Sequence, residues 1–232
     1  MSHYKIDDKK LASVTTIISD CSDKSGALTQ WAANMVVEWI KENAYETGDV
    51  PEYLVGIEEL NLARFNFRDV SKTALDVGSK VHQAIEDYFN LGKEPINPEP
   101  QVLAAFVAFL EWVDEHDVKC DDAELTVTDG KSAGTLDFVG EIDGVRTVVD
   151  FKSSKAIYPE YRYQIAAYKY MYNLYYFELK ADRCGILRLD KETGYSEYKD
   201  TTKTYEKDLN VYHKMVELFY ARHPRLRKQA KL

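Results

Sequence analysis

Cysteine is scarce in this sequence, which limits the structural and redox roles that thiols can have. The three cysteines, Cys21, Cys120 and Cys184, are far apart, form no CxxC pair and are odd in number. A disulfide framework requires paired cysteines and an iron–sulfur cluster requires a full set of thiolate ligands, so the sequence predicts neither. We expect three small side chains that are buried or half-buried.

Long apolar runs and nucleotide-binding loops are also missing. No stretch approaches the ~18 consecutive apolar residues of a transmembrane helix, and residues 1–8 lack the apolar core of a signal peptide. We therefore expect a cytoplasmic protein with no membrane partner. Neither GxxxxGKS nor GxxxxGKT occurs in the sequence, which argues against a helicase motor in this chain.

Excess positive charge is missing as well, since the formal net charge is −9. This argues against a protein that coats nucleic acid by bulk electrostatic attraction. A local grip on nucleic acid remains open, because carboxylates that bind a metal ion count as negative and the ion reverses their effect. The basic stretch at residues 222–231 predicts either a solvated, disordered end or an arm that contacts phosphates.

A chain of 232 residues can bury one sizeable core, with or without a helical appendage. Its apolar residues recur at helical spacing in some segments and alternate with polar residues in others. The expected helices cover residues 27–45, 52–65, 71–91, 99–115, 158–177 and 204–222, and the expected strands cover residues 124–128, 134–142, 145–151, 183–190 and 195–199. The β-branched residues 13–18 predict an edge strand or a packed loop.

The order of these elements predicts an α/β fold, with a central mixed β-sheet whose faces are covered by helices. We expect three parts along the chain. Residues 1–70 would form a helical N-terminal part packed on the core, residues 71–222 the core itself, and residues 223–232 a basic tail.

Two carboxylates and a lysine form the most informative local pattern. Asp143-Gly144 is a strong two-residue hairpin signal between two strand-like segments. If these strands pair in register, Asp137 lies opposite Asp150 on one face, roughly 5 Å apart at Cβ. Lys152 follows two residues later and emerges on the same face. The acids would repel one another unless a cation or a proton lay between them, so the cluster is either a metal site or a surface ion-pair cluster.

Further polar side chains stand on the predicted helices. His82 lies in mid-helix, and Gly78 one turn earlier would allow another element to approach the backbone closely. Taken alone, His82 is either a ligand or an ordinary surface or packed histidine. Gln164 and Tyr168 lie one turn apart on the helix after Lys152, inside a stripe of tyrosines, where the Gln amide needs hydrogen-bond partners.

Together these residues resemble the motifs of the PD-(D/E)XK nuclease superfamily, and specifically of its RecB-like and Cas4-like exonuclease branch. The matching segments cover about residues 71–170, in the family's order and at its usual spacing: Gly78-Ser79-Lys80-Val81-His82, Gly134-Thr135-Leu136-Asp137, Asp150-Phe151-Lys152-Ser153 and Gln164-Ile165-Ala166-Ala167-Tyr168. The segments at 13–16 and 185–190 also resemble phage or mobile-element members. The cysteines that hold an iron–sulfur cluster in Cas4-like members are missing here.

The resemblance implies a restriction-endonuclease-like core at residues 71–222 and a metal site within it. His82, Asp137 and Asp150 would be metal ligands, with the backbone carbonyl of Phe151 as a fourth. Carboxylate and carbonyl oxygens suit Mg²⁺, and an added imidazole moves the preference toward Mn²⁺. The expected cofactor is therefore Mg²⁺ or Mn²⁺, with no iron–sulfur cluster.

The resemblance also implies roles for the neighbouring residues. Lys152 would hold or polarise the attacking water and offset charge in the transition state. Gln164 and Tyr168 would order the active site and the nucleic-acid backbone. Glu124 falls where the family often carries an acid in its first core strand, and a plain solvent-facing residue is equally compatible with the sequence.

The implied activity is that of a metal-dependent DNA exonuclease that leaves a 5′-phosphate and a 3′-hydroxyl, in recombination, repair or phage DNA processing. Its expected partner is DNA, as single strands or duplex ends, with a recombination or helicase protein as a further candidate. Basic side chains near the site would either track a single strand or be ordinary surface charges: Lys131, Lys155, Arg162 and Lys169. The alternatives are a non-catalytic nucleic-acid- or protein-binding module and a restriction-type endonuclease on the same fold.

Overall fold

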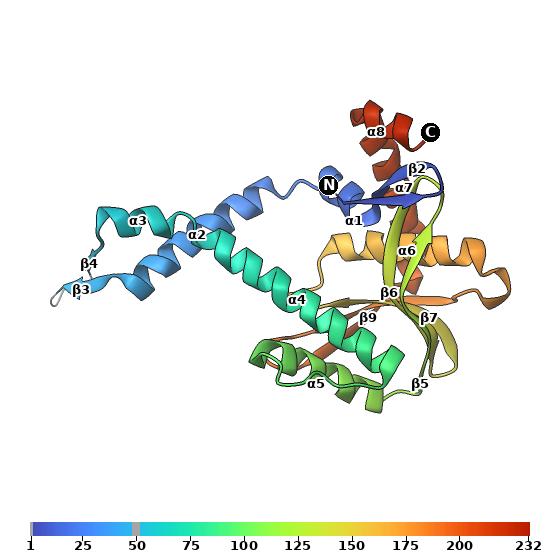
Figure 1. The fold of residues 1–232 in the computed structure, drawn as a ribbon, viewed down its shortest axis with the longest axis horizontal. Helices are drawn as coiled ribbons and strands as arrows, with labels where there is room; N and C mark the ends of the chain where they lie inside the picture. The colour runs from blue at the N-terminus through green and yellow to red at the C-terminus, as the bar shows by residue number, and fades with distance from the viewer. Residues whose placement is uncertain (1, 48–51) are drawn as a thin grey trace. The chain divides into compact units, whose positions relative to one another are not determined.

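A computed structural model of the chain describes residues 2–47 and 52–232, and its elements are labelled in Figure 1. The chain divides into two units, the first comprising Met1–Ser22 and Gly78–Leu232 and the second comprising Asp23–Val77. The first residues of the chain therefore belong to the same unit as the predicted core. The expectation that residues 1–70 pack on that core stays a prediction.

The second unit is mostly helical. It contains α2 (Ser25–Asn43), the antiparallel strands β3 (Tyr45–Thr47) and β4 (Glu52–Leu54), α3 (Ile57–Ala63) and the beginning of α4 (Asn66–Leu91). Helix α2 confirms the helix expected at residues 27–45. The helix expected at 52–65 is only partly correct, because its first residues pair with β3 as a strand and the helix begins at Ile57.

The first unit is built on a seven-stranded mixed sheet, which confirms the expected α/β class. The sheet order is β1-β2-β6-β7-β8-β9, with β5 also paired to β6. Two pairs of strands, β2 with β6 and β7 with β8, are parallel, and the others are antiparallel. The strands are β1 (His3–Ile6), β2 (Lys9–Ser13), β5 (Val118–Thr128), β6 (Ser132–Ile142), β7 (Val145–Lys152), β8 (Arg183–Leu189) and β9 (Ser196–Asp200).

Helices cover both faces of this sheet, and Figure 1 shows α5 and α6 on opposite sides of it. On one side, α1, α6 and α7 contribute to a continuous apolar core. On the other side, Phe109 of α5 packs on Phe151 of β7, with ring centroids 5.8 Å apart. The helices of this unit, besides the end of α4, are α1 (Val14–Cys21), α5 (Pro100–Asp114), α6 (Pro159–Tyr175), α7 (Tyr205–Arg222) and α8 (Pro224–Gln229), with short 3₁₀ turns at Phe177–Leu179 and Thr202–Thr204.

The strand or loop expected at residues 13–18 is wrong, because the segment is helix α1. Ser13 caps the helix, its hydroxyl oxygen accepting a hydrogen bond from the amide of Thr16 at 3.0 Å. Val14, Ile17 and Ile18 are buried at helical spacing. A local cap and an apolar face thus outweigh the β-propensity of the branched residues.

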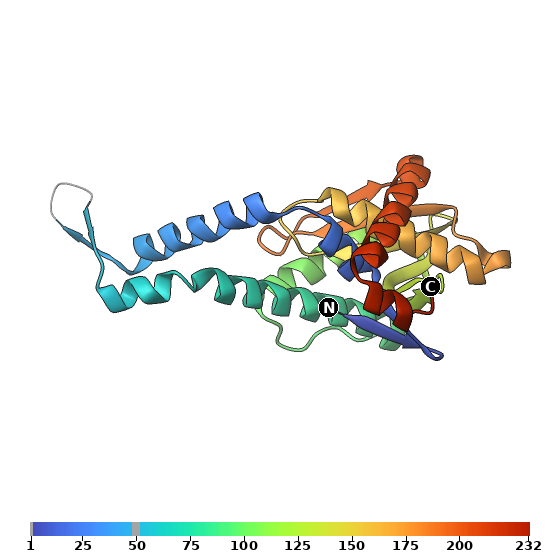
Figure 2. The same ribbon diagram turned by 90° about the horizontal axis from the view of Figure 1, so that it is seen from above.

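The basic stretch near the C-terminus is ordered, so the expectation of a disordered end is wrong. Pro224–Gln229 form α8, and Ala230 is fully buried. The amide of Ala12 in β2 donates to the Tyr220 hydroxyl of α7 at 3.4 Å. Figure 2 shows the red C-terminal helices beside the blue N-terminal strands. The two ends of the sequence therefore complete one edge of the same unit.

Candidate metal centre

The β6–β7 hairpin has the register that its turn predicts. Asp143 and Gly144 both have positive φ, 53° and 74°, as a type I′ turn requires. Ladder pairs run from Ile142↔Val145 to Phe138↔Val149. Asp137 and Asp150 are the next positions in this register, one step beyond the last recorded pair, so the register agrees with the predicted opposition of the two acids.

At Asp137, a hydrogen bond to the side chain takes the place of a backbone hydrogen bond between the two strands. Its Oδ2 accepts a hydrogen bond from the Phe151 amide at 2.7 Å, at the point where the recorded pairing of β6 and β7 stops. Its Oδ1 lies 3.4 Å from Nδ1 of His82. The side chain is almost completely buried, so the hairpin fixes this carboxylate between a backbone donor and an imidazole.

Glu124 joins the same group from the neighbouring strand. The pairs Ala123↔Phe138 and Leu125↔Leu136 flank it, which puts Glu124 opposite Asp137. Its backbone has a φ of 57°, a left-handed conformation that a non-glycine residue adopts at a cost of about 1–2 kcal/mol. Its Oε1 lies 3.8 Å from Nδ1 of His82. The sequence left open whether Glu124 belongs to the site or simply faces solvent. In the structure its carboxylate faces the site.

His82 reaches this group from α4. A Cβ built on Gly78, one turn earlier, would lie 3.4 Å from the Ser153 hydroxyl, so the helix passes close to the end of β7. Burial alone would lower the pKa of His82. The charge of Asp137 and hydrogen bonding to Asp137 and Glu124 outweigh burial and raise that pKa to about 10. Ligand atoms of His82, Glu124 and Asp137 all lie within 4.8 Å of one another.

Asp150 and Lys152 stand beside these three residues. Asp150 is fully buried, and apart from the Lys152 ammonium no group in the described part of the chain donates a hydrogen bond to its carboxylate oxygens. The Lys152 Nζ lies 2.7 Å from its Oδ2 as an ion pair. Burial raises the pKa of Asp150 to about 6, against the opposing charge of Lys152. Burial would lower the pKa of Lys152, but the charges of Asp150 and Asp137 raise it.

The two predicted residues of α6 also come together. Gln164 Nε2 donates to the Tyr168 hydroxyl at 3.2 Å, which gives the amide a partner. Burial, together with the charges of Asp150 and Asp137, raises the pKa of Tyr168, which keeps its hydroxyl protonated. A Cβ on Gly134 would lie only 2.4 Å from the Tyr168 ring, so the glycine of this predicted motif makes room for the tyrosine.

Two of the four basic residues expected to track nucleic acid are engaged inside the protein. Lys169 is buried, and its Nζ donates to the carbonyl of Asp182 at 2.7 Å. Arg162 makes a bidentate pair with Asp208, with N···O distances of 2.8 and 3.0 Å. The expected basic track is therefore wrong at these two positions. Lys131 and Lys155 are exposed.

The donor set fits a hard divalent cation. It offers an imidazole, two carboxylates in one cluster and a third carboxylate, on Asp150, that is buried with Lys152 as its one donor among the described residues. Oxygen ligands with one imidazole suit Mg²⁺ or Mn²⁺. The backbone carbonyl of Phe151 is the fourth expected ligand. The amide of the same residue donates a hydrogen bond to Asp137. The left-handed backbone of Glu124 has no signal in the sequence, and it is the one feature of this site that pattern reasoning missed.

Among residues 2–47 and 52–232, no helix has both the length and the apolar character that a bilayer crossing requires. No family model matches the chain, and no curated protein matches it. The resemblance to PD-(D/E)XK nucleases therefore depends on the residue pattern alone.

Proposed function

We propose that this protein is a divalent-metal-dependent nuclease that hydrolyses phosphodiester bonds in DNA, with a restriction-endonuclease-like core. It acts as an exonuclease and leaves a 5′-phosphate and a 3′-hydroxyl, in recombination, repair or phage DNA processing. The proposal takes its reaction class from the residue pattern and its support from the geometry of Asp150 and Lys152.

The single observation that carries the proposal is the state of Asp150. A fully buried carboxylate whose one donor among the described residues is the Lys152 ammonium is unfavourable unless something else compensates it. Lys152 supplies one positive charge at 2.7 Å, and the second carboxylate, Asp137, is on the same hairpin. A cation beside both acids would complete this compensation.

The residues that would hold the ion are His82, Glu124, Asp137 and Asp150, together with the backbone carbonyl of Phe151. When bound, Mg²⁺ or Mn²⁺ would neutralise charge at the phosphate and lower the pKa of a water molecule. His82 contributes a neutral nitrogen donor only after it loses the proton that Asp137 and Glu124 stabilise. Metal binding and protonation of His82 therefore compete.

Lys152 and the α6 residues act on the reactants themselves. The Lys152 ammonium stands beside Asp150 and can donate hydrogen bonds to a water molecule or to a phosphate oxygen that gains charge. It also lies 5.1 Å from the centre of the Tyr161 ring, which restricts where the ammonium can point. Tyr168, protonated and bound by Gln164, offers a fixed hydroxyl at the same site.

The decisive experiment is a metal-dependent time course on end-labelled single- and double-stranded DNA, read for product size. We expect cleavage with Mg²⁺ or Mn²⁺ and none in EDTA. Linear DNA should be degraded and closed circular DNA should survive, whereas a restriction-type endonuclease would cut both. A non-catalytic binding module would leave all substrates intact.

The matched variants are Asp150→Ala, Lys152→Ala and the control Lys155→Ala. Lys155 is exposed and follows the same strand, so its loss should leave cleavage unchanged. We expect both site variants to abolish cleavage, and Asp150→Ala to weaken metal binding as well. Wild-type activity in a purified, folded Asp150→Ala or Lys152→Ala protein would refute the proposal.

A further inference from the structure

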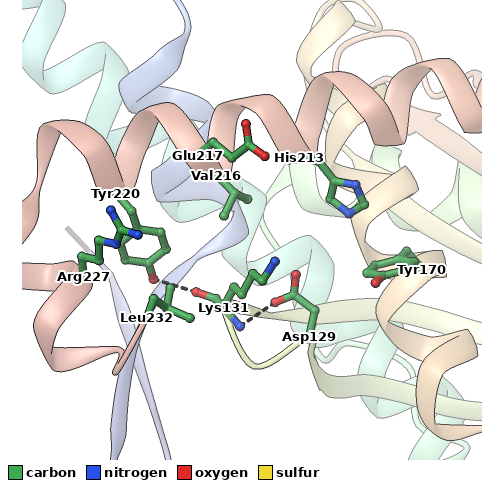
Figure 3. A pocket seen from close by; sticks show the side chains of 9 residues that line it. All are labelled: Asp129, Lys131, Tyr170, His213, Val216, Glu217, Tyr220, Arg227 and Leu232. Atoms are coloured by element: carbon green, nitrogen blue, oxygen red, sulfur yellow. Dashed lines mark hydrogen bonds between the residues drawn. The ribbon is translucent and has the colours of Figure 1, made fainter.

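A pocket lies away from the metal centre, at the far end of the β5–β6 hairpin. Figure 3 shows the hairpin turn on one side and α7 on the other, with the C-terminal residues closing one end. Its volume is about 400 Å³, which lies within the usual range for small-ligand sites. Nothing in the proposed chemistry at Asp150 uses this space.

Two cations line the pocket without an ion-pair partner. Lys131 comes from the hairpin turn and Arg227 from α8, and no acidic side chain of the described residues pairs with either. Two unpaired cations from different elements that converge on one hollow form a local site for an anion with several oxygens, such as a phosphate.

Two acidic side chains also line the pocket, and one of them is engaged in the hairpin turn. Asp129 Oδ1 accepts hydrogen bonds from the amides of Lys131 and Ser132, at 2.9 and 2.7 Å, and so belongs to the turn. Glu217 is exposed on α7, and in Figure 3 its carboxylate lies beside the α7 ribbon, across from Lys131. The two cations therefore outnumber the one acidic side chain of the lining that the turn does not engage.

An aromatic pair stands at the other end of the same hollow. Tyr170 of α6 and His213 of α7 meet edge to face, with ring centroids 5.2 Å apart and an angle of 79°. Figure 3 shows the His213 ring reaching from α7 toward Tyr170. Aromatic faces beside a phosphate site are the combination that binds a nucleotide, because the base stacks while the phosphate meets the cations.

We propose that this pocket binds a phosphate-bearing nucleotide, and that this nucleotide is the end of the DNA strand on which the metal centre acts. The assignment of the strand rests on the proposed function. Lys131 lies six residues before Asp137 in the sequence, so at ~3.3 Å per residue the two are at most about 20 Å apart. At ~3.4 Å per nucleotide of B-form DNA, about six nucleotides laid straight cover that distance.

The test measures binding in EDTA, where no cleavage occurs, so its result does not depend on catalysis. The variant is Lys131→Ala/Arg227→Ala, and the matched control is Lys214→Ala/Lys228→Ala. The control removes the same charge from α7 and α8 at exposed positions that do not line the pocket. The probes are fluorescent single-stranded oligonucleotides with a 5′-phosphate, a 3′-phosphate or hydroxyl groups at both ends, a closed single-stranded circle, and adenosine monophosphate.

We expect wild type and control to prefer one of the phosphorylated ends, and the pocket variant to lose that preference with about tenfold weaker binding. The slope of log affinity against log salt should fall by about 1–2 in the pocket variant. Equal binding by the pocket variant and the control would overturn the proposal. If the pocket variant loses as much affinity for the closed circle as for the strand ends, end recognition is overturned. If it loses affinity for adenosine monophosphate alone, the pocket binds a free nucleotide instead.

The same measurement separates this proposal from the proposed function. If the pocket variant loses end binding while the wild-type protein shows no metal-dependent cleavage, the pocket stands and the nuclease proposal fails. If the wild-type protein cleaves DNA with the expected metal dependence but the pocket variant binds ends normally, the reverse holds.

Discussion

Glu124 lies directly across the β5–β6 ladder from Asp137, with its backbone in the left-handed region at a φ of 57°. Asp137 in turn faces the position of Asp150 across β6 and β7. Three carboxylates on three neighbouring strands thus form one row across the sheet. The strained backbone at Glu124 interrupts the ladder at that row, which is a recurrent property of functional sites.

The strain at Glu124 can be separated from its carboxylate by two substitutions. Glu124→Gly and Glu124→Ala both remove the carboxylate, but only glycine adopts a φ of 57° without steric cost. We expect the glycine variant to be more stable than the alanine variant by about 1 kcal/mol in urea unfolding without metal. Both should bind Mn²⁺ more weakly than wild type in calorimetry. Equal stability of the two variants would show that the backbone is not strained there.

Metal addition should stabilise the wild-type protein. A ligand that binds only the folded state adds about 2.7 kcal/mol at 100 times its Kd, which for a chain of this size raises Tm by roughly 5–10 °C. Thermal melts with and without Mn²⁺ measure this shift. His82→Ala and Asp150→Asn should lose most of it. Asp122→Asn, an exposed change on β5 outside the cluster, should keep it, and a shift that survives in all three variants would place the ion elsewhere.

Gly134→Ala tests the contact that positions Tyr168. The added Cβ would lie 2.4 Å from the ring and 3.0 Å from the hydroxyl of Tyr168, so the tyrosine must move. We expect a loss of stability of about 1–3 kcal/mol and a fall in cleavage, with stability partly restored in Gly134→Ala/Tyr168→Leu. Gly26→Ala is the control, because no atom lies within 4 Å of the place that its Cβ would take. Unchanged melting of Gly134→Ala would contradict the close packing.

Arg162→Ala should act on folding and not on nucleic-acid binding. Asp208 is buried and accepts hydrogen bonds from Arg162 and from the Thr204 hydroxyl. Loss of the arginine leaves a buried carboxylate with two hydrogen bonds fewer, which we expect to lower the free energy of unfolding by about 1–3 kcal/mol, given the partial exposure of Arg162. Denaturant unfolding measures this change. In the binding assay, the salt dependence of DNA affinity should stay at the wild-type value, and a smaller slope would restore Arg162 to the basic track.

The register of the site could be predicted because it follows from local chemistry. Asp143-Gly144 permits one tight turn, and the alternation of apolar residues then leaves a single in-register pairing of β6 with β7. That pairing fixes Asp137, Asp150 and Lys152 without knowledge of any distant contact. The helix that carries His82 was also predictable, because its apolar spacing is regular from Ser71 to Leu91.

The errors arose where a local cap or a distant partner decides the structure. Ser13 caps α1 through Thr16 and overrides the β-branched residues that follow. Lys169 has the sequence context of a surface charge, but it is buried between Asp182 and the ring of Tyr205, which lie far along the chain or on another element. The positive φ of Glu124 could not be predicted, because it is a property of the backbone that the residue type at that position does not indicate.

The row of carboxylates comes from one uninterrupted meander, residues 118–152, whereas the imidazole comes from a separate helix. Contacts close in sequence form sooner than distant ones, so during folding the three acids would be gathered before His82 arrives to offset them. Magnesium or manganese present while the chain folds would then relieve their mutual repulsion early, so an ion bound there would assist folding before the imidazole completes the site.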